Sequence, residues 1–401
     1  MRTIPFFSGR LARNALAWLA AAVLAIGCGG GGGGGGDDSA GSALTIGTIT
    51  GFGSIIVDGV RFDDSGAQVV DDDDTPHASN DLRLGMTVEV LSDRVQTNSS
   101  GRRAHARHIR FGAEIVGPVE AIDPAARQLT VLGQTVEVTD TTVFDDSLAG
   151  GLPALALGDL VEVHAQFNAA NGHYIAKRIE KEDRVNFFRL RGLVSNLDAT
   201  AKTFDIGGAT ISYAAIASAD LPPNFADGAR VRVRLQTVAI AGVWQAVTIR
   251  SGVRKVEDHA EAEVRGIVTA FTDLTSFSVN GLPVTTGAGT AFSDGTAGIV
   301  LGAEVEVEGA IVDGVLVASE VELEDHHRGD DDRLNELHGT VGALDTTAQT
   351  FVVRGVRVHY SAGTTFDDGS VSDLADGKQV EVKGRLATDG VTLEAVKVDF
   401  E

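Results

Sequence analysis

Two short runs of aspartate are the residues of this chain whose type and spacing point most directly to chemistry. Carboxylate oxygens are the ligands that hard divalent cations such as Ca²⁺ prefer. His77, His326 and His327 lie beside the runs and could add imidazole ligands for a transition metal. Runs of like charge are also typical of solvated loops. The sequence therefore predicts weak divalent-cation binding at most, at Asp71, Asp72, Asp73, Asp74, Asp330, Asp331 and Asp332.

A second acidic pattern is a phenylalanine followed by two aspartates. It recurs at Phe62-Asp63-Asp64, Phe144-Asp145-Asp146 and Phe366-Asp367-Asp368. Paired carboxylates can bind a cation, but an aspartate after a strand usually accepts hydrogen bonds from the backbone of the following turn. We expect turn caps at these positions, with the phenylalanines in the core.

Signatures of common enzymes are missing from the sequence. There is no Gly-x-Ser-x-Gly elbow and no glycine-rich phosphate loop, and the histidines do not recur at one place. We therefore expect a non-enzymatic protein without a cofactor, and an envelope enzyme or accessory subunit is the alternative. Nucleic-acid binding is not expected, because the net charge is −23 and only 5% of the residues are aromatic.

Most of these aspartates lie in segments that belong to a repeat, because three series of glycines each occur five times along the chain. One series closes a two-residue break between apolar runs, at Gly59, Gly133, Gly208, Gly281 and Gly355. A second precedes a Val-x-Val pattern, at Gly85, Gly158, Gly228, Gly302 and Gly377. The third is Gly101, Gly172, Gly242, Gly314 and Gly390. Such regular recurrence indicates a tandem array.

Each repeat is predicted to be a small β module. Apolar residues alternate with polar ones, and pairs such as Asp58-Gly59 favour tight hairpin turns. Five strands with a longer insert after the third favour an OB-like barrel, and an open sandwich of two hairpins is the rival. We expect an all-β, rod-like array of five such units. Their predicted ranges are 44–112, 113–188, 189–258, 259–323 and 335–401, with an acidic linker over 324–334.

The N-terminus predicts export and a lipid anchor. Arginines precede a short apolar segment, which is typical of a signal peptide over residues 1–27. The residues Leu24-Ala25-Ile26-Gly27-Cys28 resemble the bacterial lipobox, which implies a signal/lipobox helix, cleavage before Cys28 and lipidation of that residue. Gly29 in place of aspartate then implies the outer membrane, facing the periplasm or the surface. Residues 28–43 are glycine-rich and predict a flexible tether.

The repeat itself resembles the bacterial domain-of-unknown-function family DUF5666. The resemblance rests on openings such as Gly47-Thr48-Ile49 and Gly339-Thr340-Val341, on the Gly-x-x-Val-Glu-Val pattern and on Thr365-Phe366-Asp367-Asp368. Members occur in tandem in secreted proteins and lipoproteins, and the family lends no catalytic residues. The resemblance implies a lipid-anchored binding or scaffolding protein of the cell envelope. Its expected partners are the membrane, through the lipid, and an unidentified envelope protein, glycan or cation.

Overall fold

The computed structural model describes residues 42–99, 101–253, 255–324 and 334–401. The predicted signal/lipobox helix, Cys28 and most of the tether lie outside these ranges, as do Asp330, Asp331 and Asp332. Within them, no helix combines the length and the apolar character that crossing a membrane requires. The described chain forms five β units, and each is a closed barrel.

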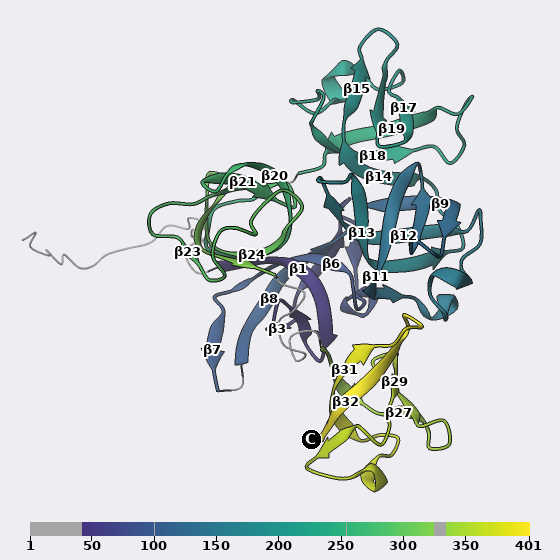
Figure 1. Cartoon of the computed structure of the whole chain (residues 1–401), viewed down its shortest axis with the longest axis vertical. Coiled ribbons are helices and arrows are strands. Elements are labelled where there is room, and N and C mark those ends of the chain that lie inside the picture. Colours follow the sequence, from purple (N-terminus) through teal and green to yellow (C-terminus); the bar gives the residue numbers. More distant parts are fainter. Residues whose placement is uncertain (1–41, 100, 254, 325–333) are drawn as a thin grey trace, which may run out of the picture. The chain divides into compact units, whose positions relative to one another are not determined.

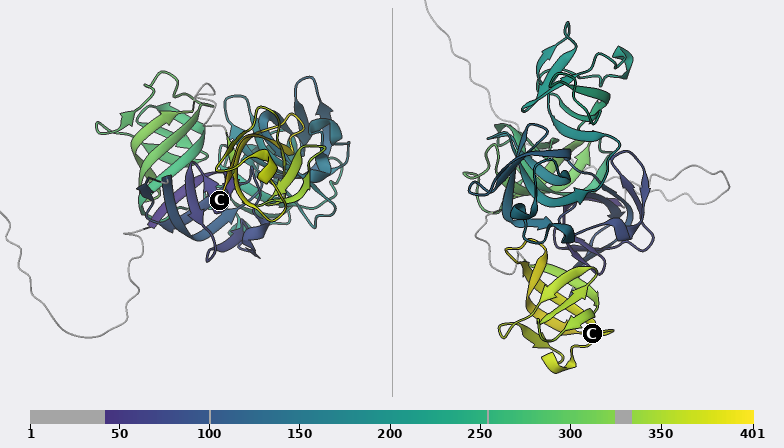
Figure 2. Two further views of the ribbon diagram at one scale, coloured as in Figure 1. Left: turned by 90° about the horizontal axis from the view of Figure 1, so that it is seen from below. Right: turned by 90° about the vertical axis from the view of Figure 1, so that its right-hand side faces the viewer.

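Unit five shows the repeat in its simplest form (yellow in Figure 2, right-hand view). Its opening strand, divided into β26 and β27, pairs antiparallel with the second strand, β28, and with the fourth, β31. The last strand, β32, pairs antiparallel with β31 and parallel with the third strand, β29. This closed order, 1-2-3-5-4-1, is that of an OB-like barrel. The elements are β26 (Asn335–Thr340), β27 (Gly342–Asp345), β28 (Thr350–Val353), β29 (Val356–His359), β30 (Thr365–Asp367), η6 (Val371–Asp373), β31 (Gln379–Leu386) and β32 (Thr392–Phe400).

The other four units close in the same order. Unit one contains β1 (Ser42–Phe52), β2 (Ile55–Val57), β3 (Val60–Asp63), β4 (Gln68–Asp71), β5 (Pro76–His77), η2 (Ser79–Asp81), β6 (Thr87–Asp93), β7 (Gln96–Asn98) and β8 (Gly101–Phe111). Unit two contains β9 (Ile115–Asp123), β10 (Gln128–Val131), β11 (Gln134–Phe144), η3 (Asp146–Leu148), η4 (Leu152–Ala154), β12 (Leu160–Asn168) and β13 (His173–Glu182).

Unit three contains β14 (Phe188–Leu193), β15 (Ser195–Asp198), β16 (Thr203–Ile206), β17 (Ala209–Ser212), η5 (Ser218–Asp220), β18 (Arg230–Leu235) and β19 (Trp244–Ser251). Unit four contains β20 (His259–Asp273), β21 (Ser276–Val279), β22 (Leu282–Thr285), β23 (Ala291–Phe292), β24 (Glu304–Val312) and β25 (Val315–Leu323). Figure 1 shows unit four nearly end-on, as a ring of strands. The prediction of small five-stranded barrels is confirmed, and the open-sandwich alternative is wrong.

A glycine with positive φ fastens the fourth strand of every unit to its opening strand. The backbone N–H of Gly377 donates to the carbonyl of Val341 at 2.8 Å, and the N–H of Val341 donates to Lys378 at 2.8 Å. The equivalent glycine N–H in the other units makes the same bond, to Ile49, Val119, Val194 and Val268. Glycine suits this place because φ lies between 84° and 89° in all five units. The second glycine series therefore marks a fixed point of barrel closure.

Buried apolar residues form a core inside each barrel, but two barrels share theirs. Units one, four and five each have a separate cluster at their centre. Units two and three are joined into one cluster. Tyr174 of β13 is fully buried in it, and its hydroxyl donates to the carbonyl of Arg191 in unit three at 2.6 Å. Two of the repeats are therefore docked through an apolar interface.

Opening strands also pair with one another between units. The N-terminal end of β1 runs parallel to β20 of unit four, from Ala43 opposite Glu261 to Ile46 opposite Val264. The other end of β1 pairs with β26 of unit five, and β9 of unit two pairs with β14 of unit three. Long strands leave free edges beyond their own barrel, and such edges favour pairing. The rod expected from the sequence would require contacts between consecutive units. Instead, β1 of unit one pairs with strands of units four and five.

Candidate functional site

The first aspartate run forms an acidic insert between β4 and β5 of unit one, with its backbone held by Asp71. Oδ1 of Asp71 accepts hydrogen bonds from the N–H groups of Asp73, at 2.8 Å, and Thr75, at 2.9 Å. Burial by itself would raise the pKa of Asp71, but these bonds and nearby Arg189 outweigh it and hold the pKa below its ordinary value. Asp71 is therefore a charged turn residue.

The rest of the insert faces an arginine-rich surface of unit three. Arg232 lies 3.3 Å from both Asp72 and Asp73, and Arg189 lies 3.5 Å from Asp73. Closer ion pairs join Arg191 to Asp72 and Arg234 to Asp73. The remaining member of the run, Asp74, pairs with Arg110 of unit one at 2.7 Å. The structure thus brings Asp71 to Asp74 together, but the groups that neutralise their charge are arginine side chains.

The arginines explain why unit three departs from the repeat pattern. Its central motif is Val-Arg-Val where the other units carry Val-Glu-Val. Strand register places Arg189 opposite Arg234 and Arg191 opposite Arg232, so like charges would repel in isolation. The acidic insert, together with Glu114 of unit two at 2.9 Å from Arg191 and Arg230, compensates them. The sequence signal was arginine at alternate positions, and the sequence analysis did not connect it to the aspartates.

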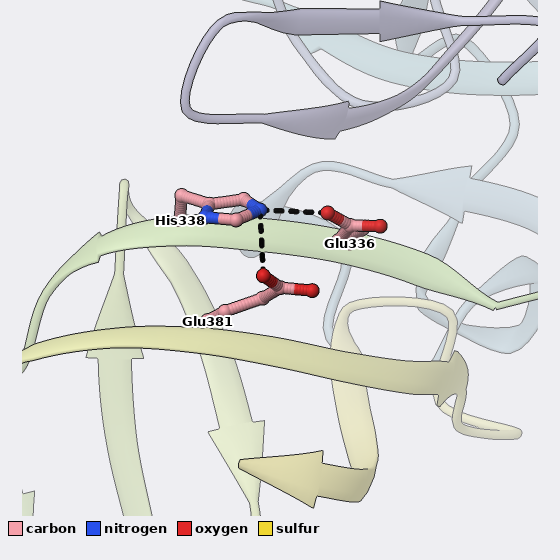
Figure 3. A group of neighbouring side chains, drawn as sticks. All are labelled: Glu336, His338 and Glu381. Atoms are coloured by element: carbon pink, nitrogen blue, oxygen red, sulfur yellow. Dashed lines mark hydrogen bonds and ion pairs between the residues drawn. The ribbon is translucent and has the colours of Figure 1, made fainter. Parts of the chain in front are cut away.

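A histidine between glutamates forms a second polar group, on unit five (Figure 3). Nε2 of His338 lies 2.6 Å from Glu336 and 3.4 Å from Glu381, which is its cross-strand neighbour on β31. All three are half-buried, and their donor atoms lie within 4.8 Å of one another. This donor set could bind a divalent metal, although the sequence analysis did not identify it. The available sequence signal was the spacing of Glu336 and His338, which are two residues apart on one strand and therefore share a face.

Two cations already occupy the carboxylates of this group. Arg61 of β3 in unit one pairs with Glu336 and lies 3.8 Å from Glu381. Lys383 lies 3.5 Å from Glu336 and 3.2 Å from Glu381. In the structure the group therefore serves as a salt-bridge network between units one and five, next to the β1–β26 pairing.

A third acidic group covers one face of unit four. Register places Glu263 opposite Glu308 and Glu306 opposite Glu322, so like charges again face each other. Carboxylate oxygens of Glu263, Glu306 and Glu308 lie within 4.8 Å of one another. Burial raises the pKa of Glu306 and of Glu308, and the nearby carboxylate of Glu263 raises both further. This face therefore favours a positive partner.

Unit one supplies part of that positive partner through the hairpin of β7 and β8, which carries Arg102 and Arg103. Arg102 of β8 donates to both oxygens of Glu263 and lies 3.9 Å from Glu308. Beside this contact, a groove of about 730 Å³ runs between units one and four. Its lining combines acidic Glu261 and Glu308 with apolar Val95 and Val317. The side chains of Glu308 and Val317 are both open to solvent.

Comparison with known proteins supports the repeat. Residues 116–180, 265–322 and 338–399 match the family described as Domain of unknown function (DUF5666). These segments fall in units two, four and five, and they confirm the family resemblance. No curated protein matches the chain.

Proposed function

Three units of this chain belong to the DUF5666 family, and from that premise we propose that the protein is a non-enzymatic binding or scaffolding protein of the cell envelope. It is anchored to the outer membrane by a lipid on Cys28, which follows a signal segment. The family carries no assigned function, so the proposal depends on the properties of the chain itself.

The groove between units one and four is the observation that carries the binding role. Its lining includes the acidic Glu308 and the exposed apolar side chain of Val317. A segment that carries lysine or arginine next to an apolar residue complements such a surface in charge and in hydrophobicity. The net charge of −23 favours a basic partner on approach as well. We therefore assign a basic segment of another envelope protein to the groove.

Site-specific photo-crosslinking in growing cells tests this assignment. A photoreactive residue at Ser319, which lines the groove, should capture a discrete partner. The same residue at exposed Ala199 of unit three, outside the groove, is the control. Glu308→Lys should lower the Ser319 cross-link at least tenfold. Glu257→Lys, at an exposed position that does not line the groove, should leave it unchanged. Equal cross-linking from Ser319 and Ala199 would count against the groove as the binding surface.

Divalent-cation binding is a second candidate, favoured by the closely spaced oxygens of Glu263, Glu306 and Glu308. Oxygen ligands of this kind suit Ca²⁺, with dissociation constants on the order of 10⁻⁴ to 10⁻³ M for extracellular sites. Calorimetric titration with CaCl₂ should then show binding that Glu306→Gln abolishes and that Glu257→Gln preserves. No binding heat for the unmodified protein would remove this candidate.

A further inference from the structure

A small cavity lined by both polar and apolar residues lies where four of the five units meet. Its volume is about 100 Å³. Thr87 of β6 lines it from unit one, and Gln166 of β12 lines it from unit two. Arg191 and Arg230 line it from β14 and β18 of unit three, while Asn280 belongs to unit four. The cavity is therefore a property of the assembled chain and of no single repeat.

Four polar atoms of this lining are buried without a hydrogen-bond partner among the described residues. They are Oγ1 of Thr87, Oε1 of Gln166 and the Nε atoms of Arg191 and Arg230. Gln166 is only 4% exposed and the side chain of Arg230 only 9%. Leaving such a buried group without a partner is costly, so native proteins rarely do it. Four of them around one cavity indicate an occupant.

The charges around the cavity point to a neutral occupant. Three arginines, Arg110, Arg191 and Arg230, stand against three acids, Asp72, Glu89 and Glu114. Arg191 and Arg230 each lie 2.9 Å from Glu114, and Arg191 also pairs with Asp72. Because the lining is balanced, an added ion would leave an uncompensated charge in a buried place, which is costly.

The hydrogen-bonding pattern requires an occupant that both donates and accepts. The two Nε–H groups can only donate, Oε1 of Gln166 can only accept, and the hydroxyl of Thr87 can do either. Water meets these demands, and the cavity exceeds the roughly 10–15 Å³ of accessible volume that one molecule needs. We infer that the cavity holds a cluster of ordered water molecules that joins units one, two and three. The cluster is a binding site for water built at the junction of the repeats.

A high-resolution crystal structure of the full mature chain tests the inference directly. Ordered water should lie about 2.7–3.2 Å from the four atoms, and each molecule should contact at least two of them. Crystals pressurised with xenon should show no xenon there, because xenon enters dry apolar cavities. Crystals soaked in bromide should show no bromide beside Arg191 and Arg230. A dry cavity, bound xenon or bound bromide would overturn the inference.

A pair of variants gives an independent test. Gln166→Met keeps the length of the side chain and removes its polar atoms, so at least one ordered water should disappear. Gln96→Met, at an exposed position on β7, is the control and should keep the full cluster. If Gln166→Met does not fold, Thr87→Val carries the test, because it keeps the side-chain shape and should lose the water at Oγ1. An unchanged cluster in the folded variant would contradict the assignment.

Discussion

Asp58 of unit one and Asn280 of unit four occupy the same place in their repeats, but Asn280 both accepts and donates a hydrogen bond whereas one oxygen of Asp58 is left without a partner among the described residues. Each begins a two-residue hairpin turn, with φ of 49° and 51°, and each lies over a glycine of the opening strand. Asn280 accepts from the N–H of Ile267 at 3.1 Å and donates to the carbonyl of Arg265 at 3.2 Å. Oδ2 of Asp58 is buried and has no partner among the described residues.

This difference predicts that Asp58→Asn stabilises the protein at alkaline pH. Burial raises the pKa of Asp58 from 3.8 to about 8, opposed by Arg265 and supported by Glu263. A raised pKa means that the neutral carboxyl stabilises the fold fully below about pH 4 and that this contribution is lost as pH rises to about 8. The amide mimics the neutral acid, so the variant should gain on the order of 5 kcal/mol at pH 9 and little at pH 4.

Urea denaturation at both pH values, with hydrogen exchange of unit-one amides, measures that gain. The control is Asp220→Asn in exposed η5, which should change neither value. A variant that is equally destabilised at both pH values would show that Asp58 is charged and favourably placed in the folded protein.

Docking of unit three on unit one should depend on the arginine surface. Arg232→Glu restores the common Val-Glu-Val pattern but sets a carboxylate against Asp72 and Asp73. Breaking a fully buried ion pair costs about 3–5 kcal/mol, and these residues are half-buried, so we expect a loss of about 2–3 kcal/mol. Hydrogen exchange should become faster at residues 71–77, whereas Arg184→Glu at an exposed position should be neutral. Slow exchange in Arg232→Glu would mean that the insert is held by other contacts.

The positive φ shared by the second glycine series predicts that a side chain at Gly377 lowers stability through backbone conformation alone. An added Cβ would meet nothing within 4 Å, so only the φ of 89° opposes a side chain. Gly377→Ala should therefore lower the stability of unit five by about 1–2 kcal/mol. Gly287→Ala is the matched control, because that site is equally open and has no positive φ. Thermal unfolding curves of the two variants should differ, and coincident curves would contradict this reason for the glycine.

Removal of Arg61 should uncover a metal site at His338. The guanidinium of Arg61 pairs with Glu336 and lies near Glu381, where a cation would bind. Without it, Lys383 still lies near both carboxylates, but a metal such as Zn²⁺ can compete with this single ammonium group for the carboxylates and bind the imidazole. Arg61→Met should bind Zn²⁺ at least tenfold more tightly than the unmodified protein in calorimetric titration. The double variant Arg61→Met, His338→Gln should lose the gain, and its persistence would place the metal elsewhere.

Lipidation at Cys28 is a prediction from the sequence motif alone. Cys28→Ser removes the thiol that would carry the lipid, so the protein should move from the membrane fraction to the soluble fraction and lose incorporation of labelled palmitate. Ser39→Ala in the predicted tether should change neither. Membrane association of Cys28→Ser at the level of the unmodified protein would exclude the lipid as the anchor.

The sequence by itself determined the repeat and the barrel, because the signals involved are local. Alternating apolar residues specify strands, and residues such as Gly59 and Gly377 require backbone conformations that side chains disfavour. The positive φ of the Gly377 series recurs in all five units, so each copy supports the others. Turn-capping by aspartate was likewise predictable, and Asp63 and Asp145 accept from the backbone of Ser65 and Ser147.

Only the tertiary structure decided which charges meet. Asp73 and Arg234 are 161 residues apart, and Arg61 and Glu336 are 275 apart. Their pairing depends on how separate barrels dock, and the docking depends on strand edges such as those of β1, which local periodicity does not describe. The same aspartate run can lie in a solvated loop, bind a cation or form ion pairs at an interface. The sequence determines the charge of the run, but the packing of the barrels decides which groups lie next to it.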